Sequence, residues 1–264
     1  MCSMQRWVEK VAVVTGSSSG IGAAISTKLV QAGVVVVGLA RRKKNLLELS
    51  EKLRNEKGKF FGFKADVSKE DDVVDAFEWI ERCLGPVHIL INNAGVIKTG
   101  YSLTSGNLKV WKEVMDTNVL GLCVVTKEAL ASMTKHNVAG HVVHINSIFG
   151  HKIGNVPLVN VYAASKHAVT ALTETLRKEF INTKLPIKVS SVSPGLVQTE
   201  LFKTAYETAM VKANIPLTDD ALSTIKALPV LTSEDVAEAI LYVLSTPPNV
   251  QVHELIVKPL FELE

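Results

Sequence analysis

Short runs of β-branched and aliphatic residues recur along the chain and alternate with longer segments in which apolar residues repeat every three or four positions. The runs are typical of buried strands, and the longer spacing, as at Val73, Phe77 and Ile80, is typical of helices that lay one face on a sheet. Seven strands are predicted, at residues 11–15, 34–39, 60–65, 87–91, 141–145, 187–192 and 254–257.

Strands that alternate with helices and are apolar almost throughout form parallel sheets that are covered on both faces. We therefore predict a Rossmann-type, doubly wound α/β fold in one domain that spans residues 1–264. Residues 195–229 show no clear strand character, and a structureless stretch of that length would be unusual. We expect short helices there that form a mobile lid over a substrate.

Composition and charge exclude several classes of function. The chain has 47% apolar residues, a net charge of +3 and dispersed basic residues, so a nucleic-acid partner is not expected. A stable membrane anchor is not expected either, because there is no apolar signal core at the N-terminus and no run long enough to span a bilayer. Cys2, Cys83 and Cys123 lack metal-ligand or redox-pair spacing and the histidines stand singly, which argues against a metal site and favours a cytoplasmic location.

A glycine-rich turn follows the first predicted strand and precedes a helix. Its spacing, G-x-x-x-G-x-G from Gly16 to Gly22, differs from the commoner dinucleotide fingerprint G-x-G-x-x-G. Glycine allows close approach of the backbone to a pyrophosphate, and the helix N-terminus offers free N–H groups. Such a turn can also simply connect two elements, but the strand before it and the helix after it favour phosphate binding. The predicted ligands are Gly16, Ser18, Ser19, Gly20, Ile21 and Gly22.

Two arginines end the second predicted strand, where an NAD enzyme would place a carboxylate against the ribose 2′-hydroxyl. Arg41 and Arg42 are suited instead to a 2′-phosphate, because the guanidinium group makes charge-assisted hydrogen bonds. They could also belong to a solvated turn, but the missing acid together with the present bases favours NADP(H) as cofactor. Ser18 is expected to bind the same phosphate, and Asp66 and Val67 lie where an adenine ring could rest.

Tyr162 and Lys166 are four residues apart at the start of a helical segment and therefore share one helix face. A free phenol has a pKa of about 10, and a nearby ammonium and an oxidised nicotinamide ring would each favour the phenolate by about one to three units. Tyr162 is predicted to move the proton when an alcohol and a carbonyl interconvert, with Ser147 holding the substrate oxygen and Lys166 also binding the nicotinamide ribose. Such a pair is more often an ordinary surface pair, so this prediction depends on the combination of motifs. Asn118, in an apolar helical stretch, is expected to have a functional partner because an unpaired amide would be costly there.

The order of these motifs resembles the short-chain dehydrogenase/reductase family along nearly the whole chain. The resemblance implies the strand order 3-2-1-4-5-6-7 and a homodimer or homotetramer formed through helices near residues 108–136 and 161–181. It implies a catalytic set of Asn118, Ser147, Tyr162 and Lys166, in which Asn118 supports a water that links Lys166 to solvent. Further cofactor contacts are implied at Asn93, Ala94, Gly95, Tyr162, Lys166, Pro194, Gly195, Val197 and Thr199.

Other stretches resemble a narrower branch of the family, which includes insect NADP-dependent farnesol dehydrogenases and a vertebrate ketosteroid reductase. Ser147 and Tyr162 are fifteen residues apart, more than is usual in the family, so loop 148–160 is expected to reshape the substrate pocket. The stretches that carry the narrower resemblance are residues 5–8, 38–42, 168–174 and 244–247.

The segments expected around the substrate are mostly apolar and contain no arginine. We predict a small hydrophobic alcohol or ketone as substrate, with farnesol or a related terpenoid alcohol first and a steroid or xenobiotic ketone as the alternative. An alternative of another class is a non-catalytic NADP-binding sensor or scaffold. The apolar candidates are Ile148, Phe149, Ile153, Pro157, Leu158, Val159, Leu196, Leu201, Phe202, Tyr206, Met210 and Ile215; Lys152, Lys203 and Lys212 could bind an anion if they turned inward.

Overall fold

A seven-stranded sheet forms the centre of the computed structural model, which describes residues 3–99, 103–104, 106–153, 160–212 and 228–262. All strand pairs are parallel and the order is β3-β2-β1-β4-β5-β6-β7, as predicted. The strand ends differ from the predicted ones by at most two residues. The strands are β1 (Val11–Thr15), β2 (Val35–Ala40), β3 (Lys59–Lys64), β4 (Val87–Asn92), β5 (His141–Ile145), β6 (Lys188–Pro194) and β7 (Glu254–Val257).

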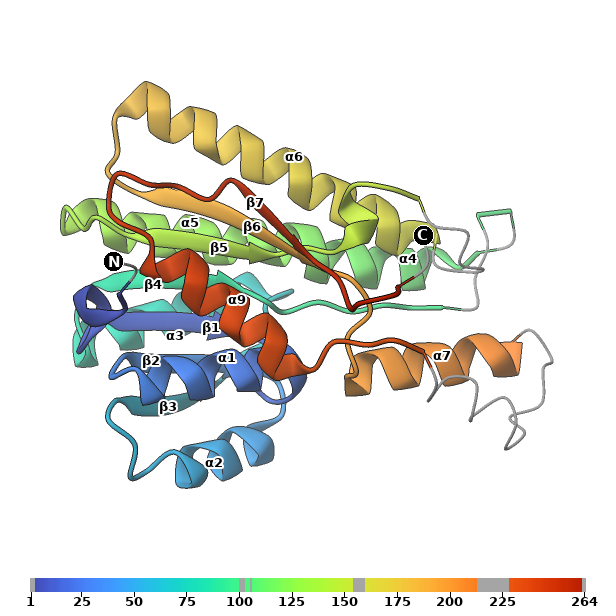
Figure 1. Cartoon of the computed structure of the whole chain (residues 1–264), viewed down its shortest axis with the longest axis horizontal. Coiled ribbons are helices and arrows are strands. Elements are labelled where there is room, and N and C mark those ends of the chain that lie inside the picture. The colour runs from blue at the N-terminus through green and yellow to red at the C-terminus, as the bar shows by residue number, and fades with distance from the viewer. Residues whose placement is uncertain (1–2, 100–102, 105, 154–159, 213–227, 263–264) are drawn as a thin grey trace.

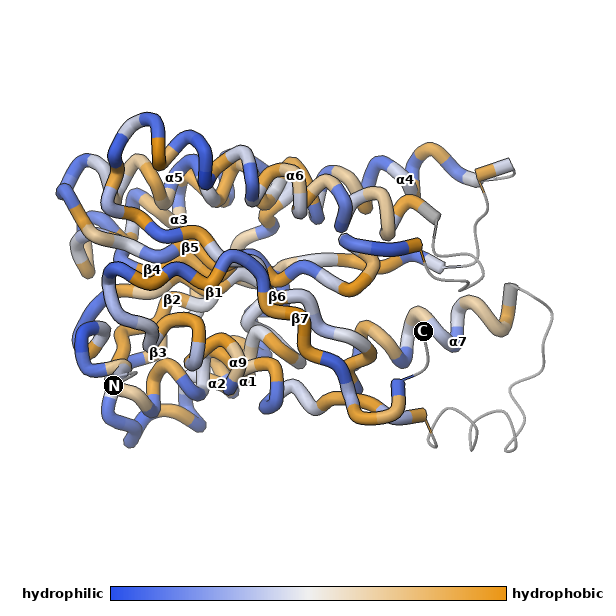
Figure 2. The backbone as a smooth tube through the Cα atoms, turned by 45° about the horizontal axis from the view of Figure 1, so that its top comes forward, coloured by the Kyte–Doolittle hydropathy of each residue, from blue (hydrophilic) through white to orange (hydrophobic). Residues whose placement is uncertain are grey.

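Helices cover both faces of the sheet (Figure 1). On one face lie α1 (Gly20–Gln31), α2 (Lys43–Lys52) and α9 (Ser233–Ser245), whose apolar residues share one core cluster with the strands. The opposite face carries α3 (Glu70–Cys83), α5 (Leu122–Lys135) and α6 (Asn160–Thr183), which share the other large cluster. Figure 2 shows hydrophilic and hydrophobic residues alternating along α5 and α6, as expected for helices with one buried face. The doubly wound prediction is confirmed.

The helical segment predicted over residues 108–136 is interrupted in the protein. A π-helical turn, η2 (Asp116–Gly121), separates α4 (Leu108–Met115) from α5. A π turn accommodates one more residue than an α turn, and such turns are frequent at functional sites. Here it contains Asn118, whose buried side chain bonds the loop that follows β4. An uninterrupted α-helix was therefore the wrong expectation at this point.

The segment predicted as a lid contains a helix, α7 (Glu200–Lys212), and its first residues join the body of the fold through a bridge between Val197 and Leu231. Two short 3-10 helices, η1 (Gln5–Trp7) and η3 (Ile148–Gly150), complete the described elements. The remaining predictions for residues 154–159 and 213–227 lie outside the described residues. No described helix is both long enough and apolar enough to cross a membrane.

Candidate active site

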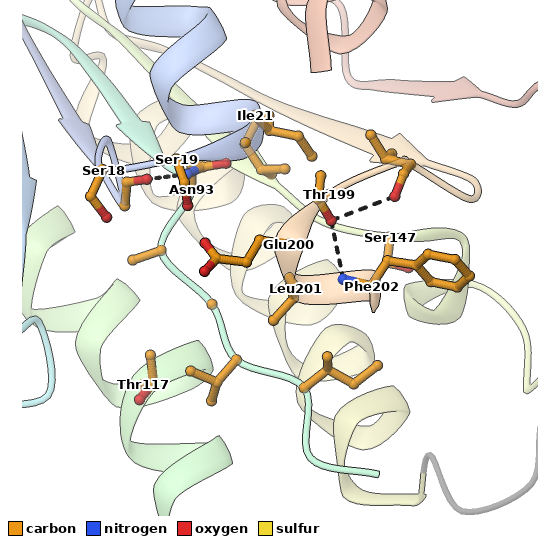
Figure 3. Close-up of a pocket in the computed structure, with 18 of the residues that line it drawn as sticks. Ser18, Ser19, Ile21, Asn93, Thr117, Ser147, Thr199, Glu200, Leu201 and Phe202 are labelled. Atoms are coloured by element: carbon orange, nitrogen blue, oxygen red, sulfur yellow. Dashed lines mark hydrogen bonds between the residues drawn. The ribbon is translucent and has the colours of Figure 1, made fainter. Parts of the chain in front are cut away.

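A cavity of about 510 Å³ opens at the carboxyl edge of the sheet, where the strand order reverses between β1 and β4. Ligands of open α/β sheets bind at this kind of switch point. Every residue predicted to contact the cofactor lines the cavity except Gly22, which packs against the carbonyl group of Gly16. Figure 3 shows Ser18 and Ser19 on one side of the cavity and Ser147 and Phe202 on the other.

The glycine-rich loop has a backbone that only glycine adopts without strain. Gly16 and Gly20 have φ values of +72° and +54°. A Cβ atom on Gly22 would lie 2.4 Å from the carbonyl oxygen of Gly16, so the start of α1 packs directly on the loop. The first turn of α1 contains no acidic residue and its N-cap, Ser19, makes no capping side-chain bond, which leaves the first N–H groups free for a phosphate.

Replacing Gly22 with alanine is expected to lower the free energy of unfolding by about 1–3 kcal/mol, because the backbone has to move to admit the methyl group. Cofactor binding should weaken as well. Thermal unfolding and a cofactor titration measure both effects. Gly85→Ala is the control for a glycine substitution away from the cavity: its φ of +86° strains an alanine, but no atom lies within 4 Å of the added Cβ, so cofactor affinity should stay unchanged. Equal cofactor affinity in the two variants would contradict the close-packing argument.

Two hydrogen-bonding side chains join the loops after β1 and β4. The Oγ1 of Thr15 accepts from the backbone N–H groups of Asn93, at 3.0 Å, and Ala94, at 2.9 Å. The amide Nδ2 of Asn93 donates to the carbonyl oxygen of Thr15 at 2.8 Å. These bonds hold Asn93, Ala94 and Gly95 against the phosphate loop along one wall of the cavity.

The candidate proton-transfer residues come from the end of β5 and the first turns of α6. Ser147 follows β5 and caps η3, accepting from the N–H of Phe149 at 3.2 Å. The ammonium of Lys166 donates to the carbonyl oxygen of Ile145 at 2.8 Å and lies 5.8 Å from the ring centre of Tyr162. The ring of Phe149 meets that of Tyr162 edge-on, with 6.3 Å between the centroids. The three predicted groups therefore meet in one corner, in which Ser147 and Lys166 are buried and Tyr162 is half-buried.

Burial is the main cause of the pKa shifts of Tyr162 and Lys166. It raises the pKa of Tyr162 to about 12, although a hydrogen bond with Ser147 acts in the opposite direction. Burial also lowers the pKa of Lys166 to about 8. The direction of the Tyr162 pKa shift is opposite to the one expected from the lysine and the oxidised nicotinamide ring, because desolvation disfavours the charged phenolate; the contribution of the cofactor stays a prediction. Tyr162 therefore holds its proton at neutral pH.

The value of kcat/KM with NADPH as the varied substrate is expected to stay constant from about pH 6 to 7.5 and to fall above about pH 8. Since burial lowers the pKa of Lys166 to about 8, its ammonium is lost as the pH rises through that value, while the higher pKa of Tyr162 keeps the phenol protonated. A pH profile of carbonyl reduction measures this. A fall centred at the ordinary lysine pKa of about 10.4 would contradict the argument.

Asn118 is buried but does not line the cavity, unlike its neighbour Thr117. Its Oδ1 accepts from the N–H of Val96 at 2.8 Å, and its Nδ2 donates to the carbonyl oxygen of Val96 at 2.9 Å and to Ser165 at 3.0 Å. Ser165 in turn donates to the carbonyl oxygen of Tyr162 at 2.7 Å. The partners of Asn118 thus belong to the fold around the site, and its support of a water stays a prediction.

The apolar end of the cavity is formed by fewer residues than predicted. Ile153 is 74% exposed and lies away from the cavity, because it follows η3 out to the surface. Ile148, Tyr206 and Met210 do not line it either, and Lys203 pairs with Glu207 on the surface of α7. Residues 157–159 and 215 lie outside the described residues. The predicted residues that do line the cavity are Phe149, Leu196, Leu201 and Phe202.

Sequence reasoning missed two charged residues of the cavity, Lys98 and Glu200. Lys98 lines it and pairs with Glu113 of α4 at 2.9 Å. Glu200 also lines it, and only its position next to Thr199, a predicted cofactor contact, could have indicated this. Neither residue stands in a motif, so their placement depends on how the loops fold back over the sheet.

Comparison with known proteins agrees with this arrangement. The sequence profile described as short chain dehydrogenase matches residues 10–209. The farnesol dehydrogenase of Aedes aegypti is 49% identical over 98% of this chain and 99% of that protein, and dehydrogenase/reductase SDR family member 11 of Mus musculus is 39% identical over 97% and 96%.

Two solved structures share the whole fold. The closed form of serine dehydrogenase complexed with NADP⁺ has a TM-score of 0.83 and 27% identity, over 96% of both chains. A single-site variant of actinorhodin polyketide ketoreductase with NADPH has a TM-score of 0.84 and 29% identity, over 95% of this chain and 96% of that one. Profile, relatives and fold agree over nearly the entire length, so this chain belongs to the short chain dehydrogenase family.

Proposed function

We propose that this chain is an NADP(H)-dependent oxidoreductase that interconverts a hydrophobic alcohol, farnesol or a related terpenoid alcohol, and its aldehyde or ketone. One domain would carry both the cofactor and the catalytic groups. The observation that carries the proposal is the meeting of Ser147, Tyr162 and Lys166 in one corner between a phosphate-binding loop and an apolar cavity end.

The cavity fits NADP(H) in its chemistry. The free N–H groups of α1 suit the pyrophosphate, and the guanidinium groups of Arg41 and Arg42 suit the 2′-phosphate. Asp66 and Val67, which follow β3, line the cavity where the adenine would rest, and Pro194 and Gly195 line it at the end of β6, on the other side of β1 and β4. When bound, NADP(H) supplies or accepts the hydride. Complexes of two solved relatives with NADP⁺ and NADPH support this choice.

Ser147, Tyr162 and Lys166 would each have a different role in the reaction, and Asn118 would support their position. Tyr162 donates its phenolic proton to the carbonyl oxygen during reduction and takes a proton from the alcohol during oxidation. Ser147 hydrogen-bonds the same substrate oxygen and aims it at the phenol. Lys166 binds the nicotinamide ribose and brings a positive charge near the phenolate once it forms. Asn118 holds α6 against the loop after β4, through Ser165 and Val96.

The substrate class follows from the lining of the cavity and from the relatives. Phe149, Leu196, Leu201 and Phe202 offer aliphatic and aromatic contacts to a long hydrocarbon. The relative in Aedes aegypti is named a farnesol dehydrogenase. Because Leu201 is 42% exposed, the apolar end is open to solvent, and a bulkier steroid or xenobiotic ketone is the second candidate.

Turnover assays test the proposal. We expect NADP⁺-dependent oxidation of farnesol, with slower or no activity when NAD⁺ is supplied at the same concentration. Steroid ketones and aromatic aldehydes with NADPH form the comparison panel. Activity restricted to charged sugars or acyl thioesters would contradict both candidate substrate classes.

We also propose a cytoplasmic homodimer or homotetramer that assembles through α4, the turn η2, α5 and α6. Exposed apolar side chains on these elements support an association surface: Leu120 on η2 is 56% exposed and Ile181 on α6 is 69% exposed. Light scattering in solution would give the number of subunits.

A further inference from the structure

All three guanidinium nitrogens of Arg42 are engaged in hydrogen bonds. Its Nε donates to the hydroxyl of Ser18 at 3.1 Å, its Nη2 to the hydroxyl of Ser19, and its Nη1 to the carboxylate of Glu200 at 2.7 Å. Arg41, which also lines the cavity, forms no hydrogen bond or ion pair within the part of the chain that the structure describes. The two predicted 2′-phosphate ligands therefore differ, since only one of them already has an anionic partner.

This ion pair joins two segments of the cavity lining that are far apart in the chain. Arg42 follows β2, whereas Glu200 is the first residue of α7 and stands next to Thr199. The start of α7 lies against the phosphate loop, because a Cβ atom on Gly20 would lie 3.4 Å from Cγ2 of Thr199. Figure 3 shows the side chain of Glu200 reaching from α7 into the cavity, with its carboxylate turned to the side on which Ser18 and Ser19 lie.

A 2′-phosphate and the Glu200 carboxylate cannot both bind Arg42 well. The phosphate brings about 1.5 to 2 negative charges and needs the fork of the guanidinium, while a carboxylate held at the same fork would repel it. The hydroxyls of Ser18 and Ser19 are neutral and can turn to donate to the phosphate, so they can remain in place. The carboxylate is the partner that has to leave.

Separating Glu200 from Arg42 costs little free energy, because both side chains are exposed. The side chains of Arg42 and Glu200 are 43% and 61% exposed, and ion pairs of this kind are weak. The ribose 2′-hydroxyl of NAD(H), by contrast, carries no charge with which to displace a carboxylate from an arginine.

We propose that Glu200 is a specificity-determining residue that competes with the cofactor 2′-phosphate for Arg42, so that NADP(H) separates this ion pair and NAD(H) leaves it intact. The inference rests on the proposed function in one respect, the assignment of Arg42 to the 2′-phosphate. It adds that the Arg42–Glu200 ion pair connects α7, which borders the substrate end, to the 2′-phosphate site only while no 2′-phosphate is bound there.

Calorimetric titration of the intact chain with adenosine 2′,5′-bisphosphate and with adenosine 5′-diphosphate tests the competition, since only the first ligand carries a 2′-phosphate. Glu200→Gln is expected to tighten binding of the bisphosphate about two- to fivefold, the range of an exposed ion pair, and to leave the 5′-diphosphate unchanged. Glu207→Gln is the matched control on the same helix, because Glu207 pairs only with Lys203 among the described residues. It should change neither affinity.

Arg42→Met separates the inference from the assignment on which it rests. This variant should weaken binding of the bisphosphate, and adding Glu200→Gln to it should then give no gain. If Arg42→Met leaves bisphosphate binding unchanged, the assignment of Arg42 to the 2′-phosphate is wrong. Suppose that Arg42→Met weakens bisphosphate binding as expected. If Glu200→Gln then also weakens bisphosphate binding, or tightens binding of both ligands equally, the competition is overturned while the assignment of Arg42 stands.

Discussion

The Tyr162→Phe variant is expected to lose about 10²- to 10⁴-fold in kcat, the usual contribution of a positioned proton donor. The phenolic oxygen is the only part that changes, and the ring contacts with Phe149 stay available. Since burial already holds Tyr162 in its protonated form, the variant removes the proton donor for carbonyl reduction without exposing a new charge. Steady-state rates with NADPH and a hydrophobic aldehyde measure the loss, and a cofactor titration should show a nearly unchanged Kd.

Tyr242→Phe is the matched control, because Tyr242 lies 52% exposed on α9, away from the cavity. It should retain full activity and the same thermal unfolding midpoint. Unchanged turnover of the physiological substrate by Tyr162→Phe would overturn the catalytic role of this residue. A non-catalytic NADP-binding sensor or scaffold would then become the leading interpretation.

Replacing both Arg41 and Arg42 with serine is expected to lower kcat/KM for NADPH by at least about 10²-fold and to leave the value for NADH almost unchanged. Each guanidinium group offers charge-assisted hydrogen bonds to a 2′-phosphate, worth about 1.5 to 3 kcal/mol, and a difference of 1.4 kcal/mol is tenfold in affinity. Neither residue is buried, so the fold should tolerate the change. Parallel kinetics with the two cofactors give the preference directly.

The single variants divide the effect between the two arginines. Arg41→Ser removes a cation without a described partner, whereas Arg42→Ser also releases Glu200, Ser18 and Ser19. Lys43→Ser, an exposed cation in the first turn of α2, controls for the general loss of positive charge. An equal fall of kcat/KM with both cofactors would mean that the arginines act on a part that NADP(H) and NAD(H) share.

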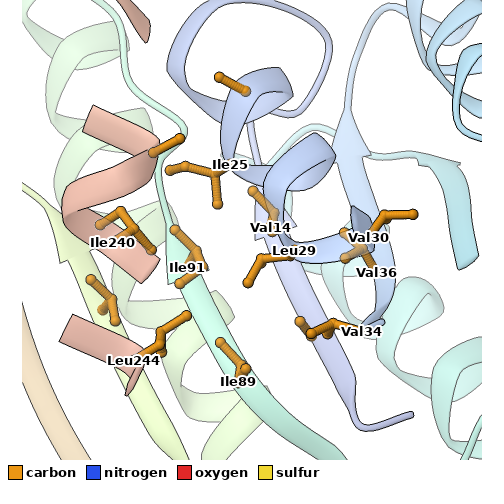
Figure 4. Packing of buried hydrophobic residues seen from close by; sticks show 14 of the residues in the cluster. Val14, Ile25, Leu29, Val30, Val34, Val36, Ile89, Ile91, Ile240 and Leu244 are labelled. Carbon is orange, nitrogen blue, oxygen red and sulfur yellow. The ribbon is translucent and has the colours of Figure 1, made fainter. Parts of the chain in front are cut away.

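The strands, the helices and the phosphate loop could be predicted because their signals are local. Apolar side chains that alternate between the two faces of β1 enter two different core clusters: Val14 packs with Ile25 and Leu29 of α1, and Val13 with the helices opposite. Figure 4 shows the first of these clusters, to which α9 adds Ile240 and Leu244. Glycine at positions with positive φ is equally local, since the backbone conformation itself demands it.

By itself, then, the sequence determined the order of the elements, the phosphate loop and the candidate proton-transfer residues, because periodicity, turn chemistry and motif spacing act over a few neighbouring residues. The tertiary structure alone decided the direction of the Tyr162 pKa, the π turn that brings Asn118 to Val96, and the pairing of Arg42 with Glu200. Burial and charge pairing depend on groups far apart in the chain, Arg42 and Glu200 being 158 residues apart, and no local pattern records such contacts.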